Sequence, residues 1–85
     1  MKIRYENSLP LAAEYFGSFG EASGYDVGTL APEQLVDVDV LAVRSTTRVT
    51  PELLACANRL TLVGTATAGI NHMDTRYLDA QGIYW

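Results

Sequence analysis

The chain has a single cysteine, no excess of positive charge and no long apolar run, and each shortage narrows the possible functions. Cys56 alone excludes an internal disulfide and a metal site built from a cysteine cluster. Six basic residues stand against ten acidic ones, and the net charge of −4 argues against nonspecific binding to nucleic acid or an anionic membrane. The N-terminal MKIRYENS lacks the apolar core of a signal peptide. We therefore expect a soluble, cytoplasmic protein with no nucleic-acid or membrane partner.

Hydrophobic residues make up 48% of the 85 residues, which favours a globular fold over disorder and allows one small domain at most. Short apolar runs alternate with stretches of helical periodicity. We expect strands at 2–5, 21–27, 37–43, 60–65 and 82–85, and helices or helical turns at 10–19, 32–36, 52–58 and 73–81. Thr50 and Asn71 are the expected N-caps of the last two helices. This alternation predicts an α/β fold, a parallel sheet with helices on both faces.

Two polar segments follow expected strands: RSTTR at 44–48 and GTATAGIN at 64–71. In a parallel sheet, ligands bind outside the carboxyl ends of the strands. If the two strands are neighbours, we expect these segments to converge.

Residues 61–74, TLVGTATAGINHMD, resemble a strand-to-helix turn that binds an anion, but they match neither common nucleotide motif. Gly64 and Gly69 have the spacing of a phosphate loop, yet Ile70 and Asn71 stand where its lysine and hydroxyl belong. The dinucleotide fingerprint G-x-G-x-x-G is absent as well. The residues of this chain therefore predict no cofactor-binding site and no metal site.

The segments VRSTTRVTPELL (43–54) and LTLVGTATAGINHMDTRYLDAQGI (60–83) resemble the N-terminal part of the erythronate-4-phosphate dehydrogenases, a branch of the D-isomer-specific 2-hydroxyacid dehydrogenase family. The similarity extends over essentially all 85 residues, and VGTATAG is its most specific part. The resemblance implies a cytoplasmic, homodimeric enzyme that uses NAD to oxidise 4-phospho-D-erythronate on the route to pyridoxal phosphate. It also implies a flavodoxin-like substrate domain that is interrupted by a Rossmann domain.

By position, Ser45 in VRST and Thr67 in GTATAG match the two substrate-contacting hydroxyls of this branch. Hydroxyl groups can hold a carboxylate or phosphate without adding a competing base. The sequence departs from the branch at Tyr5, where DEN becomes YEN, and at 70–72, where TDH becomes INH. These departures put the conformation of the loops in question, but they leave both hydroxyls in place.

The resemblance also implies that the catalytic arginine, glutamate and histidine, and the whole NAD domain, lie beyond Trp85. We therefore assign no catalytic residue here and expect the isolated chain to be inactive and not to bind NAD. His72, the only histidine, is interpreted as a packing or surface residue in the first turn of a helix. Arg44 and Arg48 could steer a phosphate, or could pair with Asp37 or Asp39 at a strand end.

Residues 82–85, GIYW, read as a strand with two large aromatic residues and nothing following to cover them. We therefore expect 1–85 to be the N-terminal part of a substrate-binding domain, and expect the isolated chain to be marginally stable or to self-associate through that edge. Two alternatives stay open: a fragment of a dehydrogenase for D-3-phosphoglycerate or another 2-hydroxy acid, and a stand-alone flavodoxin-like binding or interaction module.

Overall fold

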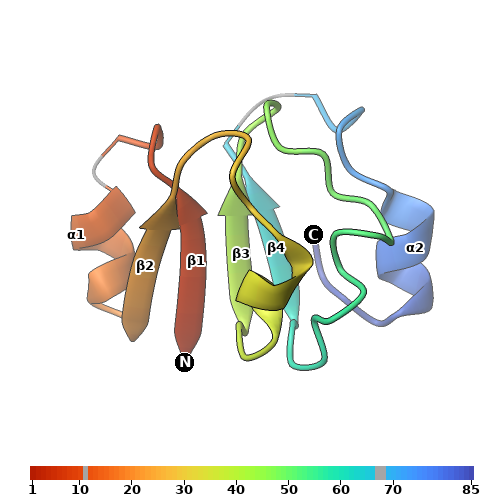
Figure 1. The fold of residues 1–85 in the computed structure, drawn as a ribbon, viewed down its shortest axis with the longest axis horizontal. Helices are drawn as coiled ribbons and strands as arrows, with labels where there is room; N and C mark the ends of the chain where they lie inside the picture. The colour runs from red at the N-terminus through yellow and green to blue at the C-terminus, as the bar shows by residue number, and fades with distance from the viewer. Residues whose placement is uncertain (11, 67–68) are drawn as a thin grey trace.

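The computed structural model describes residues 1–10, 12–66 and 69–85, which form a sheet with helices on either side (Figure 1). The elements in chain order are β1 (Lys2–Glu6), α1 (Ala12–Gly17), β2 (Glu21–Tyr25), the 3-10 helix η1 (Pro32–Leu35), β3 (Val40–Val43), β4 (Leu62–Thr65) and α2 (Thr75–Ala80). No helix among the described residues is both long enough and apolar enough to cross a membrane.

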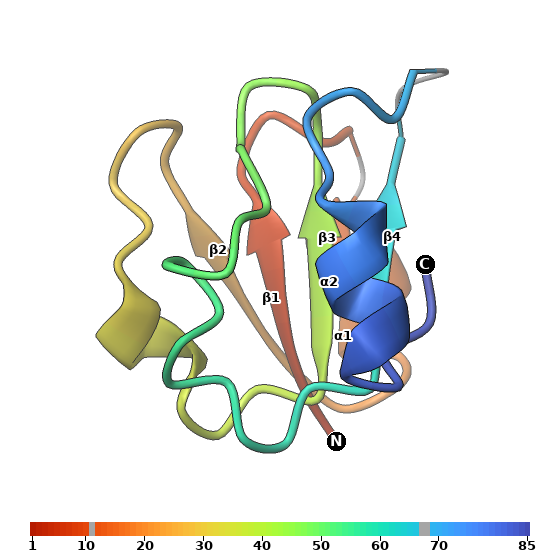
Figure 2. The same ribbon diagram turned by 90° about the vertical axis from the view of Figure 1, so that its right-hand side faces the viewer.

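The four strands are parallel and lie in the order β2-β1-β3-β4. This order matches the first four strands of the flavodoxin-like arrangement. Figure 2 shows α2 in front of the sheet and α1 behind it, so helices cover both faces. The predicted flavodoxin-like α/β fold is confirmed.

The core lies on the sheet face that carries α2 and η1. Leu41, Val43 and Val63 on the two adjacent strands are fully buried there, together with Leu35 and Leu78 from the two helices. Successive strand residues point to opposite faces, so the neighbouring Leu62 lies on the α1 side of β4 and is 39% exposed. Most of the apolar burial is therefore on one side of the sheet.

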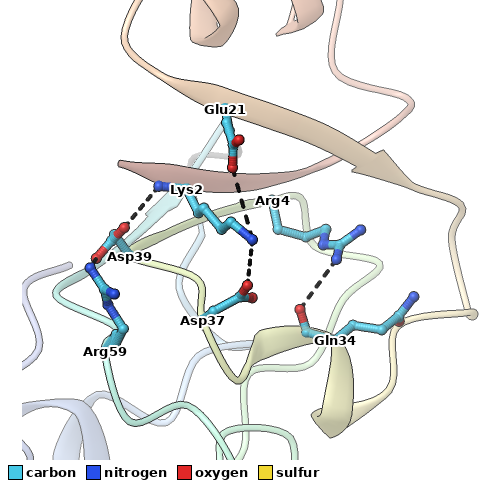
Figure 3. Close-up of polar contacts among 7 residues, drawn as sticks. All are labelled: Lys2, Arg4, Glu21, Gln34, Asp37, Asp39 and Arg59. Atoms are coloured by element: carbon cyan, nitrogen blue, oxygen red, sulfur yellow. Dashed lines mark hydrogen bonds and ion pairs between the residues drawn. The ribbon is translucent and has the colours of Figure 1, made fainter.

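Exposed ion pairs tie the amino ends of the strands together, at the edge of the sheet opposite the loops described below (Figure 3). The Lys2 ammonium group pairs with Asp37 and, at 3.8 Å, with Glu21, while Arg59 lies 3.5 Å from Asp39. Solvent screens such pairs, and exposed pairs of this kind typically contribute less than about 1 kcal/mol each. Their main consequence is that Asp37 and Asp39 have partners at this end of the molecule.

The predicted helix at 52–58 does not form, and turns occupy that segment. Thr50 does cap these turns, because its Oγ1 accepts a hydrogen bond from the Leu53 amide at 3.2 Å. Helical segments this short are marginal on their own. Here Leu54 and Leu60 are buried in the core, so packing rather than helix propensity determines the path of the chain.

The last helix is shorter than predicted and has a different cap. The Asp74 carboxylate accepts a hydrogen bond from the Tyr77 amide at 3.0 Å, so Asp74 rather than Asn71 is the N-cap of α2. Gly82 follows the helix with φ of 71°, a conformation that favours glycine. The predicted strand at 82–85 is reduced to a single parallel bridge, in which Tyr84 pairs with Leu62.

The one-sided core predicts very different effects for two leucines on adjacent strands. We expect Leu41→Ala to lower the free energy of unfolding by about 2–5 kcal/mol, because it opens a cavity in a fully buried site. The control Leu62→Ala, at a partly exposed site, should cost less than about 1 kcal/mol. Urea unfolding followed by circular dichroism measures both, and equal losses would contradict the assignment of the core.

Candidate functional site

The loops that follow β3 and β4 converge at the carboxyl edge of the sheet, at the top of Figure 1. Backbone hydrogen bonds join them: the Val49 amide donates to the His72 carbonyl at 2.8 Å, and the Asp74 amide donates to the Val49 carbonyl at 2.9 Å. The predicted convergence is therefore confirmed for the described parts of both loops. It follows from the parallel pairing of β3 with β4, which brings both carboxyl ends to the same edge.

Between these loops lies an open polar depression of about 500 Å³. Its lining residues are Ser45, Thr46, Arg48, Gly69, Asn71 and His72. The volume lies within the roughly 300–1,000 Å³ of typical small-ligand sites. Ser45, the first predicted site residue, lines this depression, whereas Thr67, the second, lies outside the described residues.

Arg48 supplies a positive charge to the depression, which the hydroxyl-bearing Ser45 also lines. In the part of the chain that the structure describes, no ion pair joins Arg44 or Arg48 to a carboxylate. The proposed pairing of these arginines with Asp37 or Asp39 is wrong, because those carboxylates pair with Lys2 and Arg59 at the opposite edge. Hydroxyl, amide and guanidinium groups together can hold an anion such as a carboxylate or phosphate ester.

His72 is 7% exposed and precedes α2 rather than lying in its first turn. Its Nε2 lies 3.0 Å from the Thr65 hydroxyl, so the ring joins the end of β4 to the segment before α2. His72 is therefore buried and hydrogen-bonded rather than on the surface, and it also lines the depression.

A buried carboxylate behind the depression was not identified from the sequence. Glu6, the last residue of β1, is 0% exposed. Its Oε1 accepts hydrogen bonds from the hydroxyls of Thr46 at 2.8 Å and Thr47 at 3.0 Å, and its Oε2 accepts one from Ser8. Glu6 shares a sheet face with Arg4, and the alternation of charged and apolar residues in this strand was the available signal. That alternation does not show whether the charged side chains face solvent or are buried and hydrogen-bonded.

The hydrogen bonds keep Glu6 ionised. Burial raises the pKa of its carboxyl, but the bonds from Ser8, Thr46 and Thr47 and from the Arg44 backbone together hold the pKa below its usual range. The hydroxyl of Tyr25 extends the network, 2.7 Å from Thr47 Oγ1. Burial raises the pKa of Tyr25 to about 12, and the nearby charge of Glu6 adds to the effect.

No group of three or more histidine, cysteine or acidic side chains suited to a metal ion occurs within residues 1–10, 12–66 and 69–85. A second depression of about 460 Å³ lies between α1 and the strands β3 and β4, and apolar groups such as Phe16 and Ala42 line it. Its lining offers no charged group to an anion. The polar depression is therefore the better candidate for a functional site.

Residues 9–85 match the family described as D-isomer specific 2-hydroxyacid dehydrogenase, catalytic domain. The chain belongs to this family. It is 48% identical over 83 residues to the erythronate-4-phosphate dehydrogenase of Pseudoalteromonas translucida, and 47% identical over 83 residues to that of Shewanella amazonensis. These alignments cover 98% of this chain but 22% of each relative, so the chain spans about a fifth of the length of these proteins.

Solved structures with the same fold include a D-lactate dehydrogenase of Aquifex aeolicus in complex with NAD and lactic acid, with a TM-score of 0.80 and 22% identity. The alignment includes all of this chain and 28% of the length of that dehydrogenase. A cofactor-bound 3-phosphoglycerate dehydrogenase of Entamoeba histolytica gives a TM-score of 0.77 at 19% identity, with 98% of this chain covering 31% of that one. At these identities the likeness supports the fold alone.

Tyr25 belongs to the hydrogen-bond network around Glu6, and its ionisation in alkaline solution can be tested. We expect Tyr25 to ionise near pH 12, and Tyr25→Phe to remove that step. An unfolded tyrosine ionises near pH 10, so the folded chain retains this proton longer, and the resulting stability is lost as the pH rises from about 10 to about 12. The ultraviolet absorbance of tyrosinate measures the titration, and an unchanged absorbance curve near pH 12 in Tyr25→Phe would contradict the prediction.

Proposed function

We propose that residues 1–85 are the N-terminal part of the substrate-binding domain of an NAD-dependent 4-phospho-D-erythronate dehydrogenase, an enzyme of pyridoxal phosphate biosynthesis. The observation that carries the proposal is the placement of Ser45 and Arg48 in one polar depression, at the edge of the sheet where ligands of such folds collect. The 48% identity to an erythronate-4-phosphate dehydrogenase supports the choice of substrate.

In this proposal the hydroxyls of Ser45 and Thr67 hold the anionic part of the substrate by donating hydrogen bonds. Arg48 lines the same depression and adds the positive charge that a phosphate ester requires. Neither hydroxyl acts as a base at neutral pH, so these residues bind and orient the substrate rather than transfer its protons. This chain contributes substrate binding, and the chemistry belongs to the rest of the enzyme.

Hydride transfer requires an NAD site and acid–base groups that we place in the remaining part of the enzyme, since this chain matches 22% of its relatives. A Rossmann domain would bind NAD, and an arginine, a glutamate and a histidine outside this chain would act on the substrate. The isolated chain should then neither bind NAD nor oxidise the substrate. The cytoplasmic location and the homodimer of the whole enzyme belong to the same proposal.

The proposal predicts selective ligand binding by the 85-residue chain. Adding 4-phospho-D-erythronate should shift amide signals of residues 44–48 and 69–72 in a two-dimensional NMR spectrum, while NAD should shift none. Ser45→Ala should weaken binding roughly tenfold or more, because it removes a hydrogen bond to a charged group. The matched control is Ser18→Ala, an exposed serine at the end of α1, which should bind as the unaltered chain does.

Two other ligands sharpen this titration. Erythronate without its phosphate should bind more weakly than 4-phospho-D-erythronate. Arg48→Ala should weaken the binding of erythronate less than it weakens the binding of the phosphate ester. Tighter binding of D-3-phosphoglycerate would favour the alternative dehydrogenase. A folded spectrum that is indifferent to every ligand would contradict substrate binding and favour the interaction module.

Self-association of the isolated chain stays a prediction, supported by exposed apolar side chains beside β4. Leu62, Tyr84 and Trp85 are 39%, 76% and 50% exposed, and Tyr84 extends the sheet by only one bridge. We expect the mean mass in sedimentation equilibrium to rise with concentration, and Leu62→Lys to reduce that rise. A monomer at all concentrations would contradict the prediction.

A further inference from the structure

We propose that Glu6 is a positioning residue for the substrate: its buried carboxylate holds residues 44–47 in the conformation that presents Ser45 to the polar depression. This inference rests on the proposed role of Ser45 as a substrate contact. Glu6 itself is 0% exposed and does not line the depression, so it acts through the loop and not on the ligand.

The carboxylate lies where three strands end. Glu6 closes β1 and is in register with Tyr25, the last residue of β2, while residues 44–47 follow β3 on its other side. It gathers hydrogen bonds from the loop that leaves β1, through Ser8, and from the loop that leaves β3, through Thr46 and Thr47. A single charged group thus connects the loop after β1 to the loop after β3, which forms one wall of the depression.

Ser45 lies in a segment that this carboxylate holds in place. The hydroxyls of Thr46 and Thr47 both donate hydrogen bonds to Glu6, and a turn closes the segment through the Thr47 amide and the Arg44 carbonyl at 3.0 Å. The Ser45 side chain is exposed and has no hydrogen-bond partner among the described residues. Its two neighbours are therefore fixed to the protein, while its own hydroxyl is left for a ligand.

The direction of each hydrogen bond suits a carboxylate at this position. Thr47 has one hydroxyl hydrogen, which it donates to Glu6, so the hydrogen between Tyr25 and Thr47 comes from the Tyr25 hydroxyl. Every neighbour of Glu6 is then a donor, which suits an ionised carboxylate with only acceptor sites. A glutamine would direct its own N–H groups at some of these hydroxyls, and its neutral amide oxygen would accept weaker hydrogen bonds than a charged carboxylate, so the loop would be held less firmly.

The test compares ligand binding and loop order in four variants of the 85-residue chain. Glu6→Gln replaces acceptors with donors at nearly unchanged volume. Thr47→Val removes one hydroxyl outside the depression, and Thr47→Ser keeps it. Val38→Ala, at a buried site before β3 at the other end of the sheet, controls for a general loss of stability.

Two readouts are measured: the dissociation constant for 4-phospho-D-erythronate by NMR titration, and amide hydrogen exchange at Ser45 and Thr46 without ligand. We expect Glu6→Gln and Thr47→Val to weaken binding roughly tenfold and to accelerate exchange at both amides. Thr47→Ser and Val38→Ala should stay within about twofold of the unaltered chain in both readouts.

The inference is overturned if Val38→Ala weakens binding as much as Glu6→Gln does, or if Glu6→Gln and Thr47→Val leave exchange at Ser45 unchanged. If the unaltered chain does not bind the ester, the proposed function fails, and the exchange readout still decides whether Glu6 orders the loop. If Glu6→Gln does not fold, Thr47→Val and Thr47→Ser decide the matter.

Discussion

The pairing of β3 between β1 and β4 is the constraint on which the rest of the structure depends. Because all three strands are parallel, their carboxyl ends meet at one edge of the sheet. The segment after β3 therefore lies between Glu6, at the end of β1, and the loop that follows β4. The same pairing buries Leu41 and Val63 on one face, so the residues that stabilise the sheet also place the site.

A buried carboxylate at this edge is costly unless it is fully hydrogen-bonded. Glu6 meets that requirement with hydroxyl donors and forms no ion pair with a cationic side chain among the described residues. Arg48 remains exposed at the depression instead. This separation lets one loop satisfy a buried anion with its threonines and still offer a serine and an arginine to an anionic ligand.

Much of the fold follows from local pattern, because an apolar run such as 40–43 indicates a buried strand directly. The position of Ser45 at the carboxyl edge of the sheet was also predictable, since a polar segment that follows a parallel strand lies there. The errors occurred where tertiary contacts override local signals: packing of Leu54 replaced the helix at 52–58, and the Asp74 cap displaced the one expected at Asn71. Glu6 was missed because two of its three hydroxyl donors, Thr46 and Thr47, lie 40 and 41 residues away in the chain, and no local pattern encodes such a distance.

The parallel sheet also separates charge along its strands. At the amino edge, Asp37 and Asp39 pair with Lys2 and Arg59, which neutralises acidic groups that would otherwise repel an anion (Figure 3). At the carboxyl edge, Arg44 and Arg48 take part in no such pair within the described residues. A chain with a net charge of −4 can therefore still offer a phosphate ester the Arg48 side chain, which lines the depression and pairs with no carboxylate among the described residues. Net charge bounds the class of partner, whereas the placement of a few paired charges decides where an anion can approach.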